Sequence, residues 1–199
     1  MSEITSLSQL DLNGTYSYAD YLTWKFDEAL ELIKGKIIPM SAPSRRHQKI
    51  SWQLTVAIGT HFKHHDCQAF AAPFDVRLLD KRKSAKANKE VRTVVQPDIC
   101  IICDDSKLDD KGCMGAPDLV IEILSPGNSS KEMRTKKELY EENGILEYLI
   151  FDPEHETVLQ FSLLASGVYS PPVIYINEDT MTSVVFPDLN IDLMEIFKN

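Results

Sequence analysis

The chain has 199 residues, of which 43% are hydrophobic and 26% are charged, which suits one soluble domain with a sizeable core. No apolar run reaches the roughly 20 residues of a membrane helix, and residues 1–12 are too polar for a signal peptide. We therefore expect a cytoplasmic protein that does not enter membranes. The net charge of −9 excludes nucleic-acid binding through the overall electrostatic field and leaves only local basic patches for that purpose.

The expected elements alternate between strands and helices. In chain order they are a polar lead-in over 1–17, helix-like spacing over 18–30, a hairpin over 31–40 turning at Lys34-Gly35, a helix over 44–65 capped by Ser44, a strand over 68–79 broken at Pro73, a polar loop over 80–92 and a strand over 93–103. After a loop with Gly112, Gly115 and Pro117 come a strand over 118–124, a helix from Ser129 or Ser130 to Asn143 closed by Gly144, a strand over 147–151, strand candidates over 157–164 and 183–186, and a short helix over 193–197. These elements predict one α/β domain over 18–199, with a central mixed β-sheet of five or more strands flanked by helices.

Cys100 and Cys103 have a Cys-x-x-Cys spacing, which raises the question of a zinc or redox site. They lie in an apolar stretch that reads as a strand, where side chains three residues apart point to opposite faces. We therefore interpret the cysteines as structural, and bound zinc would contradict that interpretation.

Three predicted strands each contain an acid where burial normally forbids one. Glu31 opens the hairpin, Asp98 follows Pro97, and Glu122 is flanked by apolar residues on both sides. A lone buried carboxylate costs several kcal/mol unless it is paired, hydrogen-bonded or bound to a metal. Acids on neighbouring strands are suited to Mg²⁺, which binds one or two carboxylates together with phosphate oxygens and waters.

Structural explanations for the same acids stay open. Glu122 can be a buried acid paired with an arginine or a backbone donor, and Asp98 can be an ordinary strand-entry aspartate after proline. The combination of the two favours a metal site at Asp98 and Glu122.

A cation beside the two acids would stabilise phosphoryl charge. The strand offers none, because the residue two positions after Glu122 is Leu124. On the following helix, at about 100° per residue, Lys136 falls near the centre of the apolar face, whereas Lys137 falls toward its edge. We expect Lys136 to be directed at the acids.

His47 lies in the first turn of the long helix, in register with Ile50 and Leu54. It is either a core histidine or a residue facing the same cleft as Glu31. Both alternatives remain open at this point.

The chain resembles one family, the Uma-two endonucleases, from about residue 18 to 197. The resemblance rests on Glu31-Leu32-Ile33-Lys34-Gly35-Lys36-Ile37-Ile38, Pro43-Ser44, His47, Pro97-Asp98, Pro117 to Pro126, Lys136, Tyr140, Gly144, Glu147-Tyr148 and Asp152-Pro153. That family belongs to the PD-(D/E)XK superfamily, so the resemblance implies a restriction endonuclease-like fold, Mg²⁺ or Mn²⁺, DNA as substrate and a homodimer. It implies that Asp98 and Glu122 are metal ligands, with Glu31 a third acid.

Two features depart from the usual pattern. Lys136 stands in for a lysine that the superfamily more often places two residues after the acid, and Glu132 occupies a position where similar sequences look to carry aspartate.

The leading hypothesis is thus a metal-dependent endonuclease with Asp98, Glu122, Lys136, Glu31 and His47 at its site. One alternative is a non-catalytic nucleic-acid or protein binding module, which the acidic balance favours; another is a hydrolase for small phosphoesters. Solvated loop charge is the ordinary reading of the basic patches, but they also supply candidate DNA contacts at Arg45, Arg46, Lys81, Arg82 and Lys83.

Overall fold

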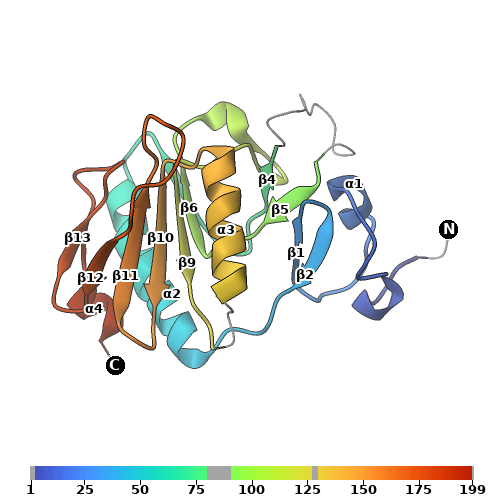
Figure 1. The fold of residues 1–199 in the computed structure, drawn as a ribbon, viewed down its shortest axis with the longest axis horizontal. Coiled ribbons are helices and arrows are strands. Elements are labelled where there is room, and N and C mark those ends of the chain that lie inside the picture. The colour runs from blue at the N-terminus through green and yellow to red at the C-terminus, as the bar shows by residue number, and fades with distance from the viewer. Residues whose placement is uncertain (1–2, 80–90, 127–129, 199) are drawn as a thin grey trace.

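Two six-stranded sheets and a two-stranded ribbon form the body of the protein in a computed structural model that describes residues 3–79, 91–126 and 130–198 (Figure 1). The first sheet runs, in spatial order, β2 (Lys36–Pro39), β1 (Leu30–Ile33), β5 (Thr93–Val95), β4 (Val76–Leu78), β8 (Gly112–Met114) and β7 (Leu108–Asp109). The second sheet runs β12 (Val173–Ile176), β11 (Thr157–Ser162), β10 (Glu147–Asp152), β9 (Leu119–Ile123), β6 (Ile99–Ile102) and β3 (Gln68–Ala71). The ribbon pairs β13 (Thr180–Thr182) with β14 (Asn190–Asp192).

Helices cover both faces of the second sheet. α2 (Arg45–Phe62) and α4 (Leu193–Phe197) lie on one face, and α3 (Ser130–Asn143) lies on the other (Figure 1). Because β9 pairs parallel with β10 and antiparallel with β6, this sheet is mixed, and its central strands are buried on both sides. The predicted α/β fold with a mixed sheet flanked by helices is confirmed.

The N-terminal segment packs against the first sheet. It contains a 3₁₀ turn, Leu7–Gln9, and the short helix α1, Tyr18–Tyr21. Leu10 and Tyr18 are buried there together with Leu32 and Val94. No described helix is both long and apolar enough to span a bilayer.

Local sequence signals account for the elements that were predicted well. The Ser44 side chain accepts a hydrogen bond from the His47 N–H and caps α2. The hairpin turns at Lys34 and Gly35, with φ of 52° and 84°, as a tight turn of this hand requires. Ser130 begins α3, which ends at Asn143 before Gly144 at φ 80°.

Four expectations are wrong. Helix α1 ends at Tyr21 instead of near residue 30, and residues 183–186 form no strand. The loop over 104–117 contains β7 and β8, together with a second 3₁₀ turn, Asp105–Lys107. The strand expected over 93–103 is divided between the two sheets, while the break expected at Pro73 separates β3 in the second sheet from β4 in the first.

Each division comes next to a proline, which lacks an N–H for a sheet ladder. Pro73 separates β3 from β4, and Pro97 separates β5 from β6. The link over 96–98 therefore passes from the first sheet to the second, and this crossing places Asp98 at the start of β6.

Cys100 and Cys103 point to different surroundings, as the strand geometry predicts. Cys103 forms a disulfide with Cys67, one step beyond the β3–β6 pairing. Cys100 and Cys113 are free and buried, and burial raises the pKa of the Cys113 thiol to about 11. The disulfide itself was not predicted, because connectivity does not follow from cysteine spacing alone.

Candidate active site

Five polar residues predicted from the sequence lie around one site where the two sheets meet α2 and α3. Glu31 is on β1, His47 is in the first turn of α2, Asp98 precedes β6, Glu122 is on β9 and Lys136 is on α3. The antiparallel pairing of β6 with β9 brings Asp98 beside the end of β9, since Ile99 pairs with Ile121. Segments far apart in sequence thus supply one cluster.

Lys136 joins two of the acids. Its Nζ donates to Glu122 Oε1 at 2.9 Å and to Glu31 Oε1 at 3.1 Å. Its side chain is 11% exposed, so these contacts are shielded from water. The neighbouring Lys137 instead contacts Glu141 at 3.4 Å on the helix surface. The predicted contact of Lys136 with Glu122, chosen by helical phase, is confirmed.

Two further residues hold the acids, and sequence reasoning missed both. The Tyr140 hydroxyl donates to Glu122 Oε1 at 2.5 Å, and Tyr140 is fully buried. The backbone N–H of Gln96 donates to Glu31 Oε1 at 3.0 Å, and the Gln96 amide nitrogen donates to Asp75 Oδ1 at 2.8 Å. Tyr140 lies one turn after Lys136, and that spacing was the available signal for it.

Asp98 is fixed on two sides. Its Oδ2 accepts the Ile123 N–H at 2.7 Å, and its Oδ1 lies 3.2 Å from His47 Nε2. His47 is buried, and its Nδ1 has no hydrogen-bond partner within the described residues. His47 is therefore both a buried helix residue and a direct neighbour of the site.

The electrostatics are dominated by burial. Burial raises the pKa of Glu122 to about 7; Lys136 opposes this shift, and Glu31 and Asp98 add to it. Burial alone would lower the pKa of Lys136, but Glu122 and Glu31 raise it above its ordinary value. The lysine therefore stays charged, and the site contains more acids than cations.

The donor set fits a hard divalent cation. Within the described residues, no hydrogen bond reaches Oε2 of Glu122 or of Glu31, because the bonds to these carboxylates all end on Oε1. Carboxylate oxygens are the ligands that Mg²⁺ takes, with waters and phosphate completing its shell. In the described part of the chain, no group of three His, Cys, Asp or Glu residues is already arranged around one point, so a metal here would rely on few protein ligands.

Comparison with known proteins identifies the family of this chain. Residues 18–194 match the Uma2 family, which is described as "Putative restriction endonuclease". This chain belongs to the Uma2 family. It is also 25% identical over 134 residues to an uncharacterized protein of Synechocystis sp. (strain PCC 6803); the match covers 66% of this chain and spans 65% of the length of that curated relative.

The fold of this Uma2 protein also resembles that of a solved structure. A protein of Anabaena variabilis, described as "a putative nuclease belonging to DUF820", superposes with a TM-score of 0.70 at 19% identity. The likeness covers 92% of this chain and 97% of the other. It supports the fold alone.

The candidate DNA contacts of this Uma2 chain differ in their surroundings. Arg46 forms an ion pair with Glu156, whereas Arg45 is exposed at the start of α2. Lys81, Arg82 and Lys83 lie outside the described residues.

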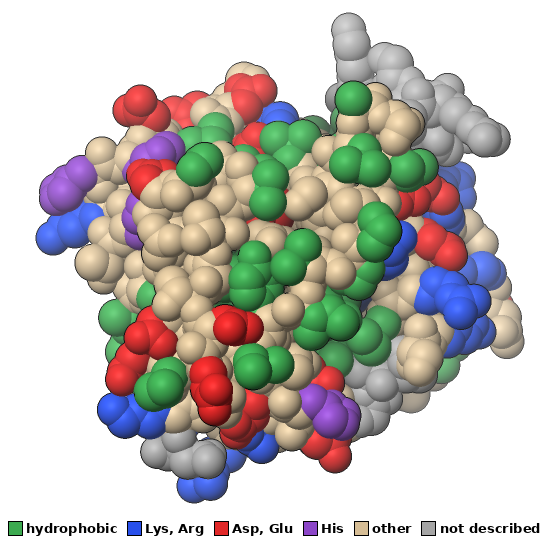
Figure 2. Space-filling view, turned by 60° about the vertical axis from the view of Figure 1, so that its left-hand side comes forward, with side chains coloured by type: hydrophobic (Ala, Val, Ile, Leu, Met, Phe, Trp, Pro, Cys, Tyr) green, Lys and Arg blue, Asp and Glu red, His purple; other side chains and the backbone are tan. Residues whose placement is uncertain are grey.

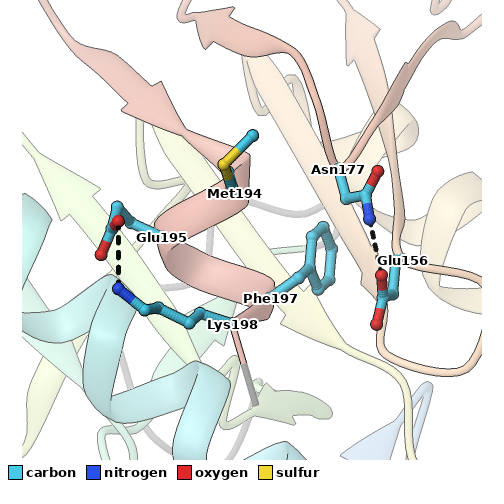
Figure 3. Close-up of a pocket in the computed structure, with 6 residues that line it drawn as sticks. All are labelled: Glu156, Asn177, Met194, Glu195, Phe197 and Lys198. Carbon is cyan, nitrogen blue, oxygen red and sulfur yellow. Dashed lines mark hydrogen bonds and ion pairs between the residues drawn. The ribbon is translucent and has the colours of Figure 1, made fainter.

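A pocket elsewhere in the Uma2 fold contains none of the predicted residues. It is lined by Glu156, Asn177, Met194, Glu195, Phe197 and Lys198, near α4 (Figure 3). Its polar groups are paired with one another, Lys198 with Glu195 and Asn177 with Glu156 (Figure 3). The pocket therefore offers no second candidate site.

Glu147 shows how this Uma2 protein satisfies a purely structural buried acid. It is 0% exposed and accepts hydrogen bonds from the Gln160 amide, the Ser183 hydroxyl and the N–H groups of Val184 and Val185. Neutral donors surround it on both oxygens. Glu122 differs, because its partners meet one oxygen and include a shared cation.

Proposed function

We propose that this protein is a metal-dependent endonuclease that hydrolyses DNA phosphodiester bonds. The observation that carries the proposal is the convergence of Glu122 and Glu31 on the buried Lys136 amine, with Asp98 beside them at the strand end. The Uma2 family description supports a nuclease, and the site supplies groups suited to phosphoryl chemistry.

In this proposal, Asp98 and Glu122 hold Mg²⁺ or Mn²⁺. A divalent ion held there would polarise the scissile phosphate and lower the pKa of a bound water.

The surrounding residues have distinct tasks. Lys136 places a positive charge where negative charge develops on the phosphate. Tyr140 and Gln96 fix the orientation of Glu122 and Glu31 through their donated hydrogen bonds. His47 lies 3.2 Å from Asp98 and limits the movement of that carboxylate.

The test is cleavage of supercoiled plasmid with and without Mg²⁺. Wild-type protein should nick or linearise the plasmid when Mg²⁺ is present, and chelation should stop the reaction. Asp98→Ala and Glu122→Ala should each remove the activity, since each deletes a proposed metal ligand. Cleavage that survives either substitution would refute the proposed site.

A pH dependence follows from the raised pKa of Glu122. Between its ordinary pKa and about 7, the buried carboxyl holds a proton that a metal must displace. The apparent affinity for Mn²⁺ should therefore fall as the pH drops below about 7, approaching about tenfold per pH unit. Calorimetric titration over this range measures it, and an affinity independent of pH would contradict Glu122 as a ligand.

A second candidate is a non-catalytic binding module that keeps the nuclease fold. One observation favours it: the acids already have protein partners, and no described cluster of three ligands is preformed. It predicts no heat of Mn²⁺ binding at any pH. It also predicts a stability that is unchanged or improved when Glu122 becomes glutamine.

A homodimer and a cytoplasmic location remain proposals as well. Gel filtration with light scattering tests the first, and cell fractionation tests the second.

A further inference from the structure

The outward side of α2 differs in charge from the rest of the protein. The helix has 18 residues and no acid among them, although the chain has a net charge of −9. At about 100° per residue, one outward stripe contains Arg45, Lys49, Trp52, Val56 and the C-cap residue Lys63. We call these residues the α2 outer face.

Trp52 is the most unusual residue of this face. It is 68% exposed, and Val56 one turn later is 46% exposed. Trp24, by contrast, stacks on Phe26 and meets Tyr16 edge to face. Among the described residues, no aromatic ring packs against Trp52, and about two thirds of this residue's surface is open to solvent.

The cations of the α2 outer face are also available. Within the described part of the chain, Arg45, Lys49 and Lys63 form no ion pair with any acid, and each is exposed. The acids that do contact α2 meet other sides of the helix. They pair with Arg46, with the inward His47 and, near the end of the helix, with His61.

Other parts of the surface offer a different composition. Figure 2 shows a face where acidic side chains gather in the lower part, hydrophobic ones are interspersed and basic ones lie mainly near the margins. A polyanion would be repelled there. The α2 outer face combines unpaired cations with a solvent-exposed aromatic ring, so it does not repel a polyanion.

The position of the helix connects this face to the site. His47 in the first turn contacts Asp98, and Trp52 lies five residues further, about 7.5 Å along the axis. A chain lying along the outward stripe can therefore pass the N-terminal end of α2 and approach the acids.

We infer that the α2 outer face binds single-stranded or locally unpaired DNA, with Arg45 and Lys49 on phosphates and Trp52 stacked on an unpaired base. An indole needs an uncovered base face, and the bases inside a duplex are already stacked on one another. The inference rests on the proposed function for its choice of DNA as ligand.

A protein partner fits this face less well. The centres of protein interfaces are depleted in charge, whereas the apolar part here is only Trp52 and Val56 with cations on either side. The mixture of separate cations and one aromatic platform is typical of single-strand binding.

The experiment measures binding without cleavage. Fluorescence anisotropy in EDTA compares a labelled single-stranded oligonucleotide, the RNA of the same sequence and a blunt duplex. In a Trp24→Phe background, the fluorescence of Trp52 reports stacking directly. Trp52→Ala is the test variant, Trp52→Phe retains a ring, and Val56→Ala is the matched control on the same face.

We expect single-stranded DNA to quench Trp52, and Trp52→Ala to weaken its binding about tenfold. Trp52→Phe should recover most of the affinity for single-stranded DNA. Val56→Ala should change that affinity by less than about twofold, and Trp52→Ala should change the affinity for duplex by less than about twofold. Lys49→Gln should reduce the dependence of DNA affinity on salt concentration by the amount that corresponds to about one phosphate contact.

Four results would overturn the inference. The first two are no quenching of Trp52 fluorescence by single-stranded DNA, and an equal loss of affinity for single strand and duplex in Trp52→Ala. The others are tighter binding of RNA than of single-stranded DNA, and a protein dimer that both Trp52→Ala and Val56→Ala dissociate without any loss of DNA binding. The plasmid assay tests the proposed nuclease function independently of this binding experiment. Binding through Trp52 without any Mg²⁺-dependent cleavage would reject the nuclease and leave the DNA surface standing.

Discussion

Replacing Lys136 by alanine should abolish plasmid cleavage, whereas replacing Lys137 by alanine should leave it nearly unchanged. Loss of one preorganised charge-stabilising donor lowers turnover by about 10²–10³-fold. Lys136 Nζ is buried between Glu31 and Glu122, so nothing in water substitutes for it. Lys137 forms a surface pair with Glu141, and such a pair contributes only about 0.3–0.5 kcal/mol to stability.

The control for this prediction separates catalysis from folding. Lys136→Ala leaves two buried carboxylates facing each other, which also destabilises the fold. Lys136→Arg keeps the charge and should regain part of the activity. Turnover is compared at temperatures where circular dichroism shows each variant fully folded. Equal activity of folded Lys136→Ala and Lys137→Ala would contradict the assignment.

Replacing Glu147 by leucine should cost at least about 3 kcal/mol of unfolding free energy, because several buried donors lose their acceptor. The Glu147 carboxylate binds the N–H groups of Val184 and Val185 and the Ser183 hydroxyl, and so fixes that turn to β10. Urea denaturation followed by circular dichroism measures the change.

The matched control is Glu154→Ala, an exposed acid near the end of the same hairpin. Its effect should stay within about 0.5 kcal/mol. The folded fraction of Glu147→Leu should keep its Mg²⁺-dependent cleavage, since Glu147 lies outside the site. A stability loss no larger than that of Glu154→Ala would show that the hydrogen bonds of Glu147 do not hold the turn to β10.

The candidate site residues could be predicted from sequence where an acid interrupts an otherwise apolar strand. An acid within the apolar run around Glu122 and an acid after Pro97 both stand out, because burial of a lone carboxylate is costly. Helical phase then placed Lys136 on the inward face, and the structure shows its contact with Glu122. Capping chemistry predicted the start of α2 at Ser44 in the same way.

The remaining contacts depend on tertiary arrangement. Gln96 reaches Glu31 across 65 positions, and that contact exists only because the link before β6 crosses between the sheets. Tyr140 could not be assigned to the site from sequence, since a buried tyrosine in a helix has the same spacing whether or not its hydroxyl binds an acid. The division of residues 93–103 between two sheets was missed because both halves are apolar and of strand type.

Metal binding at Asp98 and Glu122 is tested most directly by a crystal soaked in Mn²⁺, with diffraction measured at a wavelength where manganese scatters anomalously. We expect a peak between Asp98 and Glu122 within about 2.0–2.2 Å of a carboxylate oxygen of each, with Lys136 beside it. No peak between these two residues at saturating Mn²⁺ would contradict the proposed metal site.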